Sequence, residues 1–272
     1  MNNGLLAFIS GMLGTMIGGT ASFVITGLVG LIVIILNAAG ANTNFLNDQV
    51  LNLLFMPCVC FNGAVAGLAV AANIRHHDIN GANGNCSLHF TKDPLVLLVG
   101  GVFGLLGYLL FLLFSYLNIP MDIGALVVLL VNSLVRVLFG TKKYIHHPQD
   151  SLFTSNQINF WLFQIIFAGG LSLVTAYFVK MSGVASLGFS LSALSLIFAF
   201  INDDFPATHH TTLIAGYAIM AADSLLLASV LGILAQIVFI LFNTYFNTGL
   251  DSHVDAPAAS IALFSLIIFT VF

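Results

Sequence analysis

A series of long, continuous apolar segments is the feature of this sequence that most constrains its fold. Segments such as 94–116, 158–179 and 225–246 match or exceed the about 20 apolar residues that a helix needs to cross a bilayer. Only 6% of the residues are charged, against about 25% in an ordinary soluble domain. The apolar residues run continuously rather than alternating with polar ones, which excludes an outer-membrane barrel. The sequence therefore predicts an all-α fold, a polytopic transmembrane helical bundle.

Glycine, proline and aspartate mark where the segments begin and end. Gly14, Gly18 and Gly19 divide the first apolar run, and Asp93 followed by Pro94 is typical of a helix start. Asp122 has the same role before the next segment. We expect ten membrane segments: 4–17, 20–37, 54–74, 94–116, 123–139, 158–179, 184–201, 208–222, 225–246 and 256–272. Polar loops are expected at 40–48 and 75–92.

Two stretches, 56–74 and 205–223, repeat one pattern at an offset of 149 positions. Each has a proline, then polar or thiol side chains, then a run of small apolar residues. The matched pairs are Pro57/Pro206, Ala66/Ala215, Gly67/Gly216, Ala69/Ala218 and Ala72/Ala221. Three further pairs of matched stretches occur in the same order in the two halves of the chain. This pattern indicates a duplicated membrane unit, with a first repeat at 1–139, a connecting loop at 140–156 and a second repeat at 157–272.

The orientation of the repeats follows from the number of spans between them. Five crossings place the second copy upside down and predict an inverted repeat, whereas a re-entrant 208–222 would make the repeats parallel. Five of the six basic residues then lie on one face, and Lys180 lies on the other. The five are Arg75, Lys92, Arg136, Lys142 and Lys143. The positive-inside rule makes their face cytoplasmic. We expect a multi-pass plasma (inner) membrane protein of a prokaryote, with the large His-containing loops in the cytoplasm.

Charge and cysteine content exclude several classes of function. The formal net charge is −4 and forms no basic patch, so nucleic acid is not an expected partner. Three cysteines make no disulfide framework. No nucleotide-binding motif is found, and no cofactor or metal is predicted. The expected partners are the lipid bilayer and a small solute or ion, and self-association into a homo-oligomer is left open.

Polar side chains at membrane depth are costly and mark candidate pathways. A helix that starts inside the membrane presents free N–H groups and a positive dipole end. Opposed helix starts from two inverted copies would enclose one site near the midplane, where His209 and His210 exchange protons and Asp255 neutralises a cation or a coupling proton. The candidate pathway residues are Pro57, Cys60, Asn62, Asp122, Pro206, Thr208, His209, His210, Thr211, His253 and Asp255.

Simpler interpretations exist for the same residues. Asp122 and Asp255 are explained by helix capping at the membrane surface, and the His209–His210 pair by an interfacial loop. The simpler interpretation of Asp203 and Asp204 is that their side chains are solvated. A metal site built from His209, His210, His253 and Asp255 has suitable ligand types but, beyond the adjacent pair, no ligand spacing.

The stretch 253–266, HVDAPAASIALFSL, resembles the signature of the HPP-type integral membrane proteins, a His-Pro-Pro-Ala stretch that opens a span. The resemblance covers His253 and 257–259 and departs by the insertion of Val254, Asp255 and Ala256. Some members of that family are linked to the movement of anions such as nitrite. The whole chain also resembles uncharacterised prokaryotic multi-pass membrane proteins.

These features favour a membrane permease for a small solute or ion over two alternatives. The first is an intramembrane enzyme that uses His209, His210 and Asp255, and the second is a non-catalytic membrane scaffold or partner subunit. A permease predicts a polar cavity at mid-depth lined from both halves, and an enzyme predicts a one-sided pocket with His and Asp in hydrogen-bond reach. A scaffold predicts a dry bundle.

Overall fold

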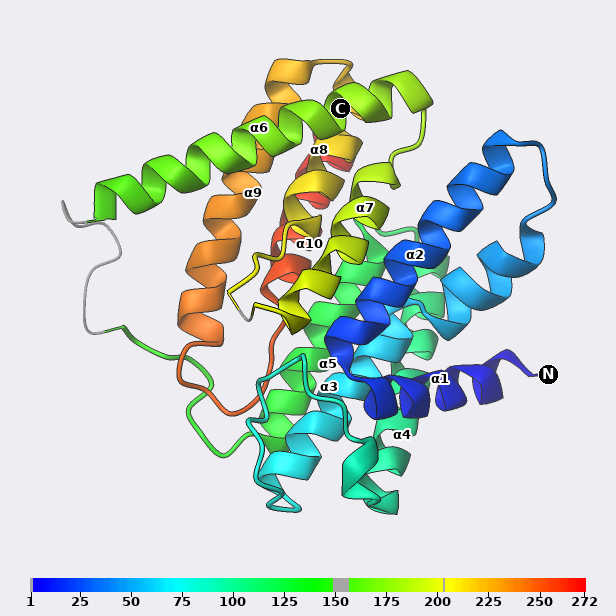
Figure 1. The fold of residues 1–272 in the computed structure, drawn as a ribbon, viewed down its shortest axis with the longest axis vertical. Helices are drawn as coiled ribbons and strands as arrows, with labels where there is room; N and C mark the ends of the chain where they lie inside the picture. Colours follow the sequence, from blue (N-terminus) through cyan, green and yellow to red (C-terminus); the bar gives the residue numbers. More distant parts are fainter. Residues whose placement is uncertain (1, 149–156, 203) are drawn as a thin grey trace.

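The computed structural model describes residues 2–148, 157–202 and 204–272. Within these ranges the chain forms ten α-helices and no strand. Their bounds are α1 Asn3–Ile17, α2 Gly19–Ala38, α3 Pro57–Asn73, α4 Pro94–Tyr116, α5 Ile123–Phe139, α6 Ile158–Ser182, α7 Leu187–Ser195, α8 His209–Ala222, α9 Leu225–Phe246 and α10 Ala256–Val271. Figure 1 shows them as one bundle with α3, α5, α8 and α10 near its centre.

Local capping explains several of the ten helix starts directly. Asp93, Asp122, Ser224 and Asp255 each accept a hydrogen bond from a backbone N–H in the first turn of α4, α5, α9 and α10, respectively. Gly18 separates α1 from α2 at φ +94°, a conformation that side-chain-bearing residues rarely adopt. The predicted starts of α4, α5, α9 and α10 are therefore correct.

Two expected boundaries are wrong. The predicted loop at 40–48 gives way at Leu46 to a π-helix, η1 (Leu46–Leu54), and α3 begins only at Pro57, after a break at Phe55 and Met56. The predicted segment 184–201 is shorter and divided, since α7 is followed by a 3-10 helix, η4 (Leu196–Phe200). In the first case Asn and Asp favour a loop, but η1 is helical with Asp48 and Asn52 exposed and buries only Leu53.

Glycine allows the closest helix contacts of the bundle. The helices α1, α3 and α4 pack as one group, in which a Cβ added to Gly104 would lie 2.6 Å from the Cα of Gly11. The helices α6, α8 and α9 pack as a second group. The two groups are joined by contacts of α2 with α7 and of α5 with α10. Small residues thus allow two helix backbones to approach each other closely at positions where a larger side chain would not fit.

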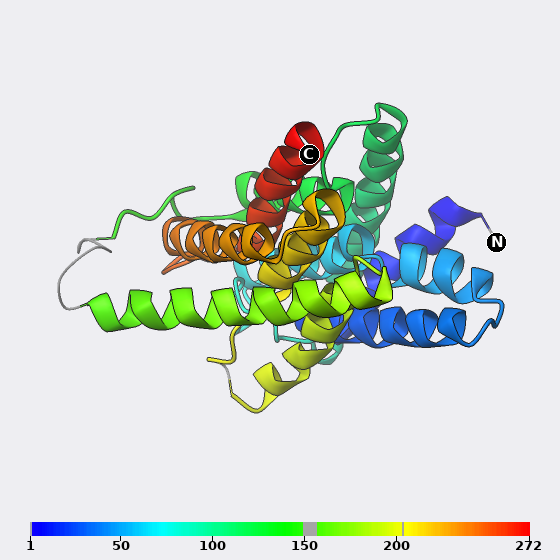
Figure 2. The same cartoon turned by 90° about the horizontal axis from the view of Figure 1, so that it is seen from above.

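The helices α3 and α8 run in opposite directions in Figure 1. The helix α3 runs from mid-height towards the lower end, and α8 runs from mid-height towards the upper end. The helices α5 and α10 are opposed in the same way. Seen from above, α6 lies along one side of the bundle, and α4 and α10 rise on the opposite side (Figure 2). Four helix starts therefore lie at mid-height.

Five segments are long and apolar enough to cross a membrane: Gly19–Ala38, Leu46–Asn73, Pro94–Tyr116, Ile158–Ser182 and Leu225–Phe246. Shorter apolar helices accompany them. At 14 residues, α8 is about 21 Å long, which is less than the about 30 Å of a bilayer core. The fold is an all-helical bundle of the membrane type.

Candidate functional site

A cavity of about 210 Å³ lies where α3, α5, α8 and α10 begin. Four of the predicted pathway residues, Pro57, Asp122, His209 and Asp255, line it together. The remaining lining residues are Phe23, Asn52, Met56, Cys58, Gly124, Ala125, Val128, Ser186, Phe189, Leu213, Tyr217, Ala258 and Ile261. The cavity is smaller than the about 300–1,000 Å³ of drug-sized pockets, but it exceeds the about 30 Å³ of one liquid water. Its size fits a small solute or several waters.

The four helix starts at the cavity are of two kinds. The α5 and α10 starts are capped by Asp122 and Asp255, whose carboxylates accept the N–H of Ala125 at 2.8 Å and of Ala258 at 2.7 Å. The starts of α3 and α8 have no side-chain cap. Uncapped helix starts leave N–H groups and a positive dipole end for solvent or a ligand.

His209, the first residue of α8, is held by two aromatic rings. Its imidazole stacks on Phe23 with a centroid distance of 5.0 Å and meets the ring of Phe189 edge-on at 5.9 Å. The residue is only 4% exposed, and neither of its ring nitrogens has a hydrogen-bond partner among the described residues. A buried polar group without a partner is costly, so this imidazole is an unsatisfied group in the wall of the cavity.

Asp122 connects three helices at the cavity wall. One of its carboxylate oxygens accepts the hydroxyl of Tyr217 from α8 at 2.7 Å, while the other caps α5. Its backbone N–H donates to the hydroxyl of Ser265 in α10 at 2.8 Å. The carboxylate is therefore fixed in place by groups from both halves of the chain.

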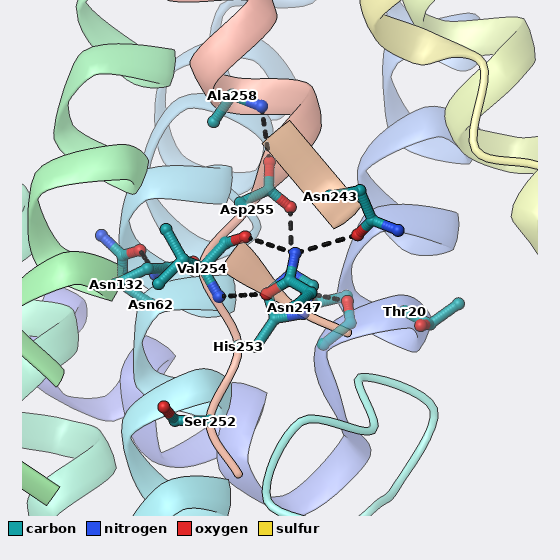
Figure 3. A network of polar contacts seen from close by, with 12 residues as sticks. Thr20, Asn62, Asn132, Asn243, Asn247, Ser252, His253, Val254, Asp255 and Ala258 are labelled. Atoms are coloured by element: carbon teal, nitrogen blue, oxygen red, sulfur yellow. Dashed lines mark hydrogen bonds and ion pairs between the residues drawn. The ribbon is translucent and has the colours of Figure 1, made fainter. Parts of the chain in front are cut away.

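Asp255 is 5% exposed and lies at the start of α10 (Figure 3). Its second carboxylate oxygen is 3.3 Å from Nε2 of His253, which does not line the cavity. Asn247 bonds through its side chain to both the N–H and the carbonyl of Val254, at 2.9 and 2.8 Å. This pairing holds the extended segment that leads into α10 and so sets the position of Asp255.

A buried arginine supports the same segment from below. Arg136, near the end of α5, is 3% exposed and donates to the hydroxyl and carbonyl oxygens of Ser252. It also donates to the carbonyl oxygens of Tyr144 and Phe246. All of these acceptors are uncharged, so the guanidinium joins the segment after α5, the end of α9 and the loop between α9 and α10, and is not a site group.

The other predicted pathway residues lie outside the cavity. Asn62 accepts from Asn132 at 2.9 Å and donates to the carbonyl of Cys58. His210 is fully buried and bonds to Gln236 at 2.7 Å, and Gln236 in turn bonds to Gln164. Thr211 bonds to the same Gln236 oxygen, Thr208 lines a separate cavity, and Cys60 is buried in helix packing. These groups are buried in packing between helices, although Oδ1 of Asn132 and Nδ1 of His210 have no hydrogen-bond partner among the described residues.

Several simpler interpretations are tested by burial. The placement of His209 and His210 on an interfacial loop is wrong, since both are buried inside α8. Pro206 is exposed and does not line the cavity, and Asp204 is exposed as expected. Asp203 lies outside the described residues. No group of three or more His, Cys, Asp or Glu side chains placed to hold a metal ion is found in the described part of the chain.

A second cavity, of about 350 Å³, adjoins the first along α2 and η1. The two share Asn52, Pro57, Ser186 and Phe189 as lining residues. The second cavity extends along α2 from Thr26 to Asn37, close to the end of that helix. Asn37, Asn52 and Ser186 are exposed, so this side of the site is accessible.

The loop between α3 and α4 contacts both α2 and η4. Asn85 accepts from the hydroxyl of Thr20 in α2 at 2.6 Å and donates to the carbonyl of Ala199 in η4 at 3.3 Å. Deeper in, Phe61 packs edge-on against both Phe23 and His253, with centroid distances of 4.9 and 5.8 Å. These contacts join the loop, α2, α3 and η4 next to the cavity, although neither Asn85 nor Phe61 lines it.

Sequence reasoning missed Tyr217, Phe23, Phe189 and Ser186. A helical period was the available signal for Tyr217, because His209, Leu213 and Tyr217 recur every four residues and all line the cavity. No comparable signal existed for Phe23 or Phe189, which come from α2 and α7 and reach the site only through the contact between these two helices.

The fold and the site define a polytopic, all-helical protein of the membrane type, with a buried cavity at the meeting point of four helix starts. The profile of the Family of unknown function (DUF7973) matches residues 2–154 and 161–272, and the chain belongs to that family. The comparison with curated proteins and the comparison with solved structures found no match. The resemblance to the HPP-type proteins has no support in these comparisons.

Proposed function

We propose that this protein is a membrane permease that moves a small solute or ion through a site between two internal repeats of five helices. The observation that carries the proposal is the cavity lined by Pro57 and Asp122 from the first half and by His209 and Asp255 from the second. Polar groups at this depth are expensive in a membrane and are typical of a transport pathway.

The packing order supports the duplication. In the first half α1, α3 and α4 pack together, α2 contacts α3, and α5 contacts α3 and α4. In the second half α6, α8, α9, α7 and α10 make the same pattern of contacts. The Asp122 and Asp255 caps occupy equivalent positions, before the fifth helix of each half. With the opposed directions in Figure 1, these features favour inverted repeats.

The one-sided access to the cavity supports alternating access. The route along α2 and η1 reaches exposed residues, whereas the contacts of Asn85 and Phe61 join the loop between α3 and α4 to its neighbours next to the cavity. The side with this loop has the basic residues Arg75, Lys92, Lys142 and Lys143. By the positive-inside rule this side is cytoplasmic, so the cavity opens to the outside.

Flux through proteoliposomes tests the proposal. Purified protein is reconstituted, and uptake is measured for a panel of small cations, anions and neutral solutes. We expect protein-dependent uptake of at least one of them, and we expect Asp255→Asn and His209→Phe to reduce it by about tenfold or more, since each removes a group at the site. Asp204→Asn, which alters an exposed carboxylate, is the control. Absence of uptake for the whole panel, or full uptake in both site variants, would contradict the proposal.

A further inference from the structure

We propose that the solute of this cavity is a small organic cation with N–H donors, a protonated amine. This inference rests on the proposed function of the same site and adds the chemical class of its substrate. It is carried by two carboxylates, an unpartnered imidazole and an apolar wall.

The full charges at the cavity are negative. Asp122 and Asp255 line it, and no Lys or Arg does. His253 is 3.3 Å from Asp255 but does not line the cavity, and the buried Arg136 is committed to the carbonyl oxygens of Tyr144, Phe246 and Ser252. An anion in the cavity would face two carboxylates of like charge, whereas a cation would be attracted by both.

The helix starts do not provide a strong site for an anion. Two of them are already engaged by Asp122 and Asp255. At α3, Pro57 has no N–H, and the N–H groups of Val59 and Cys60 both donate to the carbonyl of Met56. Of the four starts, only that of α8 has neither a side-chain cap nor a proline in its first turn, and its first residue, His209, lines the same cavity.

His209 is the independent sign of a missing ligand. Both of its nitrogens lack partners in the described structure, although the residue is 96% buried, as its 4% exposed fraction implies. A neutral imidazole has one nitrogen that accepts a hydrogen bond. A protonated amine carries several N–H donors for such acceptors and for the carboxylates, whereas a quaternary cation has none.

The remaining wall favours an organic cation over a metal ion. Met56, Val128, Leu213 and Ile261 are apolar, and the rings of Phe23 and Phe189 present faces or edges to the cavity. Aromatic faces attract organic cations. A metal ion would need several close ligands, and no group of three such side chains is found among the described residues.

Binding measured in detergent tests this proposal independently of transport. The thermal unfolding midpoint of the purified protein is compared, at pH 7 and matched ionic strength, in propylammonium chloride, propionamide and sodium propionate. These three probes share size and shape and differ in charge. We expect a concentration-dependent rise in the midpoint with propylammonium alone.

Matched variants complete the test. Asp122→Asn, Asp255→Asn and His209→Phe should each weaken the apparent propylammonium Kd by about tenfold, which equals the loss of one interaction of about 1.4 kcal/mol. Asp204→Asn should leave it unchanged. The inference is overturned if propionate or propionamide stabilises the protein as well as propylammonium, if none of the probes does, or if the three site variants respond like the wild type. Propylammonium binding without flux would refute the permease and leave the cation site standing.

Discussion

At the scale of single residues, adjacent positions in α8 have different roles. His209 faces the cavity without a partner, while His210 bonds to Gln236 inside the bundle. Successive residues of a helix point about 100° apart, since one turn takes 3.6 residues. A sequence motif of two histidines therefore contains one site residue and one packing residue. Arg136 and Asp251 are two further single residues of interest, because they support the segments below the site.

Replacement of Arg136 should cost a large share of the stability. Arg136→Met removes the donors of the carbonyl groups of Tyr144, Phe246 and Ser252, and each unsatisfied buried carbonyl costs about 1–3 kcal/mol. We expect a marked fall of the unfolding midpoint in detergent. Lys142→Met, at an exposed site, should change it little. Equal unfolding midpoints for both variants would show that the guanidinium does not hold the segments of Tyr144, Phe246 and Ser252 together.

Asp251 should make stability depend on pH under acidic conditions. Its partial burial works to raise the pKa, but bonds from the Thr141 hydroxyl and from the N–H groups of Thr141 and Lys142 hold the pKa below the ordinary value of 3.8. A carboxyl group whose pKa is lower in the folded state than in the unfolded state stabilises the fold at pH values above its unfolded-state pKa. This stabilisation is lost as the pH falls through the folded-state pKa. The thermal unfolding midpoint should therefore decrease as the pH is lowered below about 4, and it should decrease less steeply in Asp251→Asn. Identical pH profiles would exclude this role.

At the scale of helices, close packing depends on where glycine is and not on how much there is. Gly104 lies in α4 against α1, whereas Gly170 in α6 has nothing within 4 Å of an added Cβ. Both are glycines in apolar helices. Only the tertiary contact separates a required glycine from a replaceable one.

The variants Gly104→Ala and Gly170→Ala should move stability in opposite directions. An added methyl group at Gly104 meets the backbone of Gly11 and should cost about 1–3 kcal/mol. At Gly170 the better helix propensity of alanine should stabilise by up to about 1 kcal/mol. Unfolding midpoints in detergent compare the two. A Gly104→Ala protein as stable as the wild type would mean that α1 and α4 are not in close contact.

Helix starts were largely predictable, and the irregular segments were not. Asp93, Asp122 and Asp255 are local signals, because a cap bonds to its own first turn. The π-helix η1 and the division of α7 from η4 are not visible in the sequence, since neighbouring helices decide these breaks. Contacts of η1 with α1 and α2, and of η4 with α2, fix them.

At the scale of the whole molecule, the proposed inverted topology makes a prediction about sidedness. In a background without native cysteines, Lys143→Cys should react with a membrane-impermeant thiol reagent from the face of the basic loops. Lys180→Cys and Ser186→Cys should react from the other face, because Ser186 lines the open route to the cavity. Intact cells and inside-out vesicles give the two directions. Labelling of all three positions from one face would refute the odd number of crossings between the repeats.

The sequence by itself determined the class of this protein and the starts of α4, α5, α9 and α10. Apolar length, sparse charge and N-caps act within one segment and need no partner to be interpreted. Only the tertiary structure decided that Phe23, Phe189 and Tyr217 join Asp122, His209 and Asp255 around one cavity, and that Pro206 and His210 do not. The reason is geometric: the rotation of each helix about its axis, and the neighbour that it meets, follow from packing between segments far apart in the chain.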